Sequence, residues 1–198
     1  MGKKLLITGF EPFGRETVNP SWEAVSRLED RIGDMEITKL RLPVVFGRAA
    51  ELTLEAARKL QPDFILCVGQ AGNRAAVTPE VVAINLRDAS MEDNAGNRPE
   101  DEPVIPGAPA AYFASIPVRG IVAALKEKEI PAALSYSAGA YVCNDLFYTL
   151  RHCYEGTHVR VGFIHVPYLP GQGDGKGPVM ELRTMVQALG IAAETLKG

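Results

Sequence analysis

The chain has 198 residues, of which 46% are hydrophobic and 23% are charged, and its formal net charge is −3 at pH 7. These values are typical of a globular protein and predict one domain over residues 1–198, without nucleic acid or a membrane as a partner. The three cysteines form no CxxC pair, so we expect reduced thiols in a cytoplasmic protein and neither a disulfide framework nor a structural metal site.

The first third of the chain alternates between apolar strands and amphipathic helices. Residues 3–8 are typical of a buried strand, and the loop GFEPFG that follows carries Phe10 and Phe13, which either cap the core or line a pocket. Asn19-Pro20 predicts the start of a helix that runs to about residue 30. We expect a strand at 35–42 and a helix at 49–60.

The middle of the chain contains a short apolar run, FILCV at 64–68, that is typical of a central parallel strand. It places Cys67 in the core and ends in a turn, 69–74, whose two glycines have the wrong spacing for a nucleotide-binding motif. Residues 77–86 predict a strand with Glu80 embedded in it. A buried carboxylate needs a partner; the alternative is that Glu80 faces water on an edge strand.

The second half continues the same alternation after a long surface loop at 88–110. It predicts a helix at 118–129, a strand at 132–136, a helix beginning at Cys143, a strand at 159–166, a loop at 169–177 and a last helix opened by Pro178. Strands and helices in this order indicate an α/β protein, a three-layer α/β/α sandwich with a twisted, mainly parallel central sheet.

Three side chains of suitable chemistry fall near the carboxyl ends of these strands. Cys143 in the first turn of a helix has the setting that favours a thiolate, although a free cysteine is also often a small buried core residue. His165 ends a buried strand, a position that is often structural, whereas we expect His152 and His158 to be solvated. With Glu80, these groups can form a nucleophile, a base and an orienting acid.

Several motifs together carry a resemblance to a known family. In order from Gly9 to Pro170 they are GFEPFG with NPS, GQAG with TPE and VAIN, DNAGN with GAPAAYF, SAGAYVCN, and GFIHVPYLP. With these motifs the chain resembles the pyroglutamyl peptidase I (pyrrolidone carboxyl peptidase) family of cysteine peptidases.

The resemblance implies a hydrolase that removes an N-terminal pyroglutamyl residue from peptides through an acyl-enzyme. It places Glu80, Cys143 and His165 on the family's catalytic positions and implies a cytosolic α/β/α fold, no cofactor, and a homotetramer or homodimer. The 5-oxoproline ring is an uncharged lactam that needs apolar walls and a few hydrogen bonds. Phe10, Phe13, Tyr141 and Val142 are candidates for those walls, and Gln70 is a candidate for reading the lactam.

Two other functions remain open at this point. One is a lapsed peptidase that binds pyroglutamyl peptides without cleaving them, and the other is an enzyme like a nucleoside phosphorylase or hydrolase, which uses a similar sheet. The chain also departs from the family pattern, because Ser90 stands where relatives carry an arginine shortly before Asp93-Asn94. We expect the thiol to be less acidic without that cation, unless Arg74 or Arg87 compensates.

Overall fold

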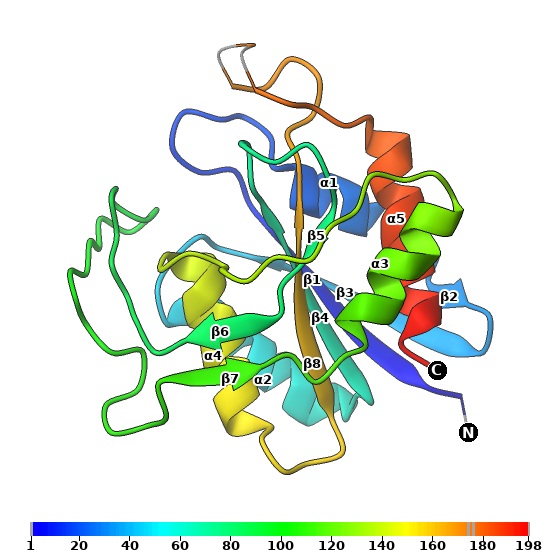
Figure 1. Cartoon of the computed structure of the whole chain (residues 1–198). Coiled ribbons are helices and arrows are strands. Elements are labelled where there is room, and N and C mark those ends of the chain that lie inside the picture. The colour runs from blue at the N-terminus through cyan, green and yellow to red at the C-terminus, as the bar shows by residue number, and fades with distance from the viewer. Residues whose placement is uncertain (1, 174, 176, 198) are drawn as a thin grey trace.

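The computed structural model describes residues 2–173, 175 and 177–197, and its centre is a six-stranded sheet in the order β2-β3-β1-β4-β8-β5 (Figure 1). The four central strands are parallel: β3 (Met35–Leu42), β1 (Lys4–Phe10), β4 (Phe64–Gln70) and β8 (Arg160–Val166). Two short antiparallel strands, β2 (Arg31–Ile32) and β5 (Thr78–Pro79), form the edges. The predicted mainly parallel sheet is confirmed.

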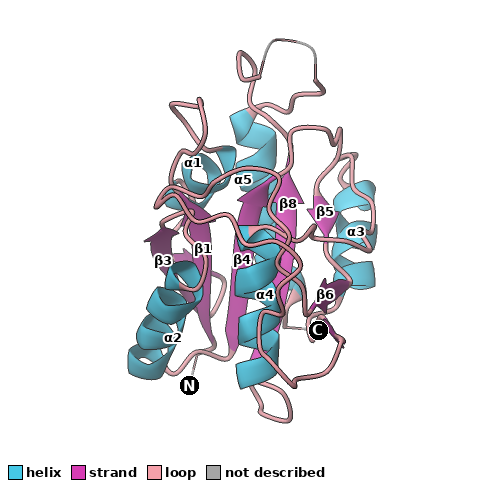
Figure 2. Cartoon of the chain, turned by 90° about the vertical axis from the view of Figure 1, so that its left-hand side faces the viewer, coloured by secondary structure: helices cyan, strands magenta, loops and turns pink. Residues whose placement is uncertain are grey.

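Both faces of this sheet are covered by helices, which is why its central strands are apolar throughout. Alternate side chains of one strand point to opposite faces: Leu5 and Ile7 belong to one core cluster, and Leu6 belongs to the other. The first cluster packs on α1 (Pro20–Ser26), α3 (Val118–Glu127) and α5 (Leu182–Thr195). The second packs on α2 (Arg48–Leu60) and α4 (Val142–Cys153), which lie in front of the sheet in Figure 2. The three-layer architecture is as expected.

The single strand expected at 77–86 is wrong, because the chain changes partners within it. Pro79 has no amide hydrogen, and the next two amides donate to different segments: Glu80 to Phe163 on β8 at 2.9 Å and Val81 to Ser135 at 2.7 Å. β5 therefore ends at Pro79, and β6 (Val82–Ile84) pairs instead with β7 (Ala111–Phe113) in a separate small sheet.

The strand expected at 132–136 is also wrong as a regular element. This segment follows Pro131 and makes only isolated parallel bridges, from Ala132 to Val77 and from Ser135 to Glu80. It lies beside residues 77–81, which change hydrogen-bond partners at Glu80, so no continuous ladder of hydrogen bonds forms between the two segments. The segment nevertheless runs along the edge of the sheet and leads into the loop before α4.

Two helix boundaries differ from the prediction because neighbouring backbone competes for the terminal residues. α1 ends at Ser26, and the amide of Ile37 donates to the carbonyl of Asp30, which draws the following residues toward β3. α5 begins at Leu182 because the amide of Met180 donates to the carbonyl of Tyr168 and keeps the preceding residues extended. In the described residues no helix has the length and apolar character that crossing a bilayer requires.

The long loop at 88–110, every residue of which the structure describes, contains no helix or regular strand but is well anchored. The buried carboxylate of Asp93 accepts hydrogen bonds from the amides of Ala95 and Asn97, each at 2.8 Å, and from the amide of Phe46 at 3.0 Å. The side chain of Asn94 donates to Glu11 in the loop after β1. The loop thus joins two other loops at one edge of the sheet.

Candidate active site

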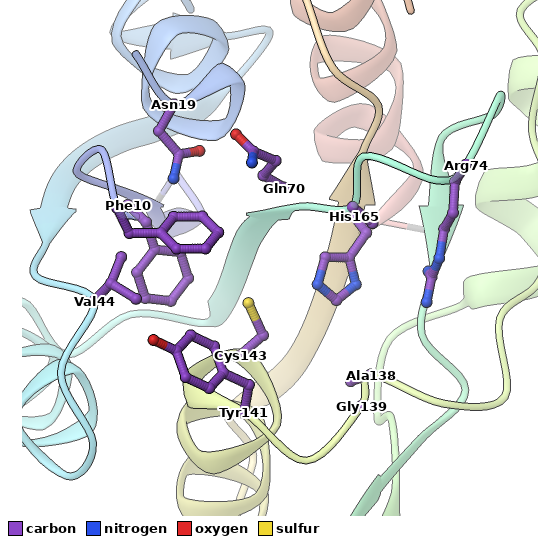
Figure 3. A pocket seen from close by; sticks show the side chains of 12 residues that line it. Phe10, Asn19, Val44, Gln70, Arg74, Ala138, Gly139, Tyr141, Cys143 and His165 are labelled. Atoms are coloured by element: carbon purple, nitrogen blue, oxygen red, sulfur yellow. The ribbon is translucent and has the colours of Figure 1, made fainter. Parts of the chain in front are cut away.

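A cavity of about 220 Å³ opens at the edge of the sheet where the parallel strands end (Figure 3). β1 ends at Phe10, β4 ends at Gln70, and His165 near the end of β8 lies beside Gly69 of β4. Ligands bind at this edge in open α/β sheets. The lining residues are Phe10, Phe13, Asn19, Val44, Gln70, Ala71, Arg74, Ala138, Gly139, Tyr141, Cys143 and His165.

Cys143 is the second residue of α4, so the helix start brings its sulfur to the cavity. Figure 3 shows the sulfur pointing into the cavity, between the phenylalanine side and His165. The sulfur rests directly against β4: a Cβ built on Gly69 would lie 2.9 Å from Cys143 Sγ and 2.8 Å from the ring of Phe163. Gly69 is therefore required for close approach, and any larger residue there would displace the sulfur or the ring.

The thiol of Cys143 is more basic than its helix position predicts. Burial raises its pKa to about 12, the Glu80 carboxylate acts in the same direction, and the cation of Arg74 opposes both. The helix N-terminus was expected to favour the thiolate, whereas burial and the Glu80 carboxylate act in the opposite direction. The free protein therefore holds a neutral thiol that needs a base before it can attack.

His165 has the environment of a neutral base. Its side chain is almost fully buried, and its Nδ1 lies 2.7 Å from Oε1 of Glu80. Burial lowers the pKa of His165, and this effect outweighs the opposing hydrogen bond and charge of Glu80. A neutral ring that donates from Nδ1 to the carboxylate keeps Nε2 as a proton acceptor.

Glu80 is completely buried, so the alternative that it faces water is wrong. Its Oε1 accepts from His165 and also from the Nη1 of Arg74 at 2.6 Å. Burial acts to raise the pKa of Glu80, but the hydrogen bond and charge of His165, followed by hydrogen bonds from Ser135 and Arg74, more than offset it and lower the pKa overall. An ionised carboxylate thus holds the imidazole.

A second buried carboxylate lies in the first turn of α4, two residues beyond Cys143. Asp145 accepts from Arg87 Nε at 2.6 Å and from the amide of Gly47 at 2.8 Å. The neighbouring amide side chain of Asn144 bonds the backbone of Ile84 in both directions, at 3.0 and 2.8 Å. These contacts fix the start of α4 to the segments on either side of it.

Most of the predicted pocket residues reach the cavity, and one does not. Phe10, Phe13, Gln70 and Tyr141 line it. Val142 as a pocket wall is wrong: its side chain is fully buried in the core. α4 already begins at Val142, and successive helical residues point about 100° apart, so Val142 and Cys143 cannot both face the cavity.

Several lining residues were not expected from the sequence. Their place in the chain could have indicated them, because each follows the carboxyl end of a parallel strand: Asn19 follows β1, Val44 follows β3 and Arg74 follows β4. Asn19 does cap α1 as predicted, accepting from the amide of Ser21. Among the described residues that line the cavity, the arginine of the turn at 69–74 is the one cation.

The two arginines that we considered as substitutes for the missing one have different positions. Arg87 is held by Asp145 and lies over the ring of Phe46, 5.9 Å from its centroid. Arg74 lines the cavity and contacts Glu80. Ser90 itself is exposed and is not a lining residue. Of these two arginines, Arg74 is the one that lies where a cation acts on the site.

The remaining polar candidates lie elsewhere. His158 is exposed as expected, but the expectation for His152 is wrong, since it is half-buried and its Nδ1 lies 2.9 Å from the hydroxyl of Tyr112. Cys67 is fully buried, as predicted, and burial raises its pKa to about 12. Within the part of the chain that the structure describes, no three His, Cys, Asp or Glu side chains are grouped to hold a metal.

A thiol, an imidazole and an ionised carboxylate around one cavity form the kind of site that cysteine hydrolases use. The chain belongs to the pyroglutamyl peptidase family, whose sequence profile matches residues 3–197. It is 51% identical to the pyrrolidone-carboxylate peptidase of Bacillus subtilis, over 98% of this chain and 93% of that protein. It is 49% identical to the pyrrolidone-carboxylate peptidase of Thermococcus onnurineus, over 97% of this chain and 98% of that protein.

Solved structures agree with the sequence comparison. Pyroglutamyl peptidase I from Bacillus amyloliquefaciens superimposes with a TM-score of 0.94 at 49% identity, covering 98% of this chain and 96% of that one. Pyrrolidone carboxyl peptidase from Thermococcus litoralis gives the same TM-score at 36% identity, with 98% and 93% covered. The family and fold predicted from the motifs are confirmed, and the alternative of a nucleoside-cleaving enzyme is wrong.

Proposed function

We propose that this chain hydrolyses the peptide bond that follows an N-terminal pyroglutamyl residue, with Cys143 as nucleophile, His165 as general base and acid, and Glu80 as the group that orients the imidazole. The observation that carries the proposal is the 2.7 Å contact between His165 Nδ1 and Glu80 Oε1 beside a cavity that Cys143 also lines. Relatives about half identical in sequence bear the name of this activity.

Acylation begins with a proton transfer, because a thiol with a raised pKa is neutral at pH 7. His165 Nε2 takes the thiol proton as Sγ of Cys143 attacks the pyroglutamyl carbonyl carbon. The resulting imidazolium is stabilised by the carboxylate of Glu80. The tetrahedral intermediate then collapses, the C–N bond breaks, and His165 gives its proton to the leaving amine. The products of this half-reaction are a shortened peptide and a thioester on Cys143.

In deacylation water takes the place of the thiol as the nucleophile, and Sγ of Cys143 becomes the leaving group. A water molecule attacks the thioester carbonyl while His165 takes a proton from it. The C–S bond then breaks, His165 returns the proton to Sγ of Cys143, and 5-oxoproline is released. In both steps the developing oxyanion needs donors, and the amides in the first turn of an α-helix have no partner within the helix. We assign this role to the amide of Cys143 in α4.

The cavity suits a small uncharged ring. Its volume of about 220 Å³ lies below the roughly 300–1,000 Å³ of sites for drug-sized ligands. Phe10, Phe13 and Tyr141 supply apolar walls, and Gln70 supplies an amide for the lactam. An N-terminal proline carries a charged ring nitrogen and no lactam carbonyl, so we expect prolyl amides to be rejected by roughly 10⁴ in kcat/KM. Comparable values for the two substrates would contradict a site built for the lactam.

The other expectations remain proposals. We propose a cytoplasmic enzyme that needs no cofactor and assembles as a homotetramer or homodimer. Light scattering coupled to size exclusion measures the assembly, and dialysis against a chelator before the assay measures any metal requirement. Full activity after chelation is the expected result.

A fluorogenic pyroglutamyl amide, assayed with and without iodoacetamide, tests the activity. We expect hydrolysis that alkylation abolishes, and no hydrolysis by a folded Cys143→Ser variant. Cys67→Ala and Cys153→Ala are matched controls that remove a thiol outside the cavity and should keep the activity. Binding of a pyroglutamyl ligand without product would support a lapsed peptidase instead.

A further inference from the structure

Arg74 connects three segments that meet at the cavity. Its Nη1 donates to Oε1 of Glu80 and to the hydroxyl of Thr78, each at 2.6 Å, and its Nη2 donates to the carbonyl of Ser137 at 2.9 Å. Ser137 directly precedes Ala138 and Gly139, which form part of the cavity wall. In Figure 3 Arg74 lies beyond His165 as seen from Cys143.

The charge balance of the buried pair depends on this contact. Glu80 has no solvent exposure, and its Oε2 has no hydrogen-bond partner among the described residues. Without Arg74 the carboxylate would face only uncharged groups, the imidazole of His165 and the side chain of Ser135, and it would draw a proton onto the pair. Arg74 supplies a full positive charge 2.6 Å from Oε1, so the carboxylate stays ionised while His165 stays neutral.

We propose, on the basis of the function proposed above, that Arg74 is a positioning residue: its guanidinium holds the Glu80–His165 pair in its unprotonated form and fixes the wall segment 137–139 to that pair. The role requires the planar fork of arginine, because two nitrogens bond groups in different directions. A lysine can keep the charge near Glu80 but cannot make both contacts.

The titration of His165 tests this role without any use of activity. The chain has three histidines, so the imidazole signals of ¹⁵N-labelled protein can be assigned with single His152→Gln and His158→Gln variants. In Arg74→Gln we expect the Glu80–His165 pair to take up its proton at higher pH than in the wild type, since a nearby cation disfavours the imidazolium. Arg74→Lys should give an intermediate midpoint. An unmoved midpoint in Arg74→Gln would overturn the proposal.

Arg87 provides a matched control. Its side chain is 23% exposed and pairs at 2.6 Å with a carboxylate that is 0% exposed, while that of Arg74 is 28% exposed and pairs in the same way. Arg87→Gln should reduce stability without moving the His165 midpoint. A midpoint that moves equally in both variants would show a general loss of structure and would overturn a specific role for Arg74.

Kinetics separates positioning from substrate binding. With the pyroglutamyl amide we expect Arg74→Gln to lower kcat by roughly 10-fold or more, with little change in KM and with the acid limb of kcat/KM moved to higher pH. A raised KM with unchanged kcat and an unmoved acid limb would assign Arg74 to substrate binding and overturn the proposal. An inactive wild type would contradict the proposed function alone, since the titration still decides the role of Arg74.

Discussion

Glu80 and Asp145 are both fully buried carboxylates paired with an arginine at 2.6 Å, yet their surroundings differ. Asp145 uses both oxygens, Oδ1 for Arg87 and Oδ2 for the amide of Gly47. All its partners are fixed donors. This pair can do little except hold the start of α4 against the helix α2 region.

Glu80 uses one oxygen for two partners, and one of these is an imidazole that can change its protonation state. Its Oε2 is left without a partner among the described residues. A fully bonded carboxylate stabilises a structure, whereas a carboxylate with a titratable partner and a free oxygen can stabilise a charge that appears during a reaction. The difference between the two pairs therefore lies in their partners and not in their burial or their charge.

Removal of the charge of Glu80 should have the largest effect on activity. Glu80→Gln should lower kcat by roughly 10³–10⁴, because an amide in place of the carboxylate no longer holds the imidazole in its productive tautomer. The protein should keep its fold by circular dichroism. A loss of less than about tenfold in a folded variant would place Glu80 outside the reaction.

The same change at the other pair should act on stability. Asp145→Asn leaves Arg87 without its carboxylate, and we expect the free energy of unfolding to fall by about 3 kcal/mol. This value lies at the lower end of the range for a buried pair, because the side chain of Arg87 keeps some contact with solvent. Urea denaturation measures it. Activity per folded molecule should change far less than in Glu80→Gln. Equal losses of activity in the two variants would remove the distinction.

A third change moves the nucleophile and leaves both pairs intact. Gly69→Ala places a methyl group 2.9 Å from Cys143 Sγ, and a small displacement of a reacting atom costs roughly 10² in kcat. Gly190→Ala in α5 is the control, because a Cβ there meets nothing within 4 Å and alanine favours a helix. Wild-type kcat in Gly69→Ala would show that the sulfur does not need its place against β4.

The smallest expected effect concerns the missing arginine. Ser90→Arg adds a cation outside the lining of the cavity, so the pKa of the thiol, about 12 in the protein, should fall by less than the roughly 1–3 units of a direct neighbour. The pH dependence of the alkylation rate of Cys143 measures the shift. A shift as large as that of a direct contact would mean that position 90 reaches the thiol.

The pH dependence of the wild type follows from the environment of His165. Burial lowers the pKa of His165, and the base works only when neutral, so kcat/KM should rise through a midpoint below the ordinary value of about 6.5. A midpoint above that value would mean that the imidazole is held in its charged form.

The sequence predicted what local patterns determine. The spacing of the hydrophobic residues and the turn residues between them were sufficient to predict the parallel strands. The predicted ends of these strands were sufficient to place Cys143 and His165 at one edge of the sheet. The division of 77–86 at Glu80 was not predictable, because it depends on amides that find partners in β8 and near Ser135. The same holds for the thiol pKa, which depends on burial by distant segments.

The contacts of Arg74 and Asp145 were missed for a related reason. Asp145 binds Gly47 and Arg87, and Arg74 binds Ser137, all dozens of positions away, and no local pattern encodes such a pairing. The contact of Arg74 with Glu80 spans only six positions, but it depends on the turn between them and on the burial of Glu80. The error at Val142 has a different origin: a shift of one residue in the helix start rotates a side chain from the cavity into the core.

The anchoring of Asp93 has a consequence for the rate of turnover. Its carboxylate accepts hydrogen bonds from Phe46 in one loop and from Ala95 and Asn97 in another, so the loop at 88–110 is held in place at this edge of the sheet. In enzymes that close a lid over the substrate, opening of that lid often limits kcat. We therefore expect that opening of this loop does not limit kcat, and that kcat is insensitive to solvent viscosity.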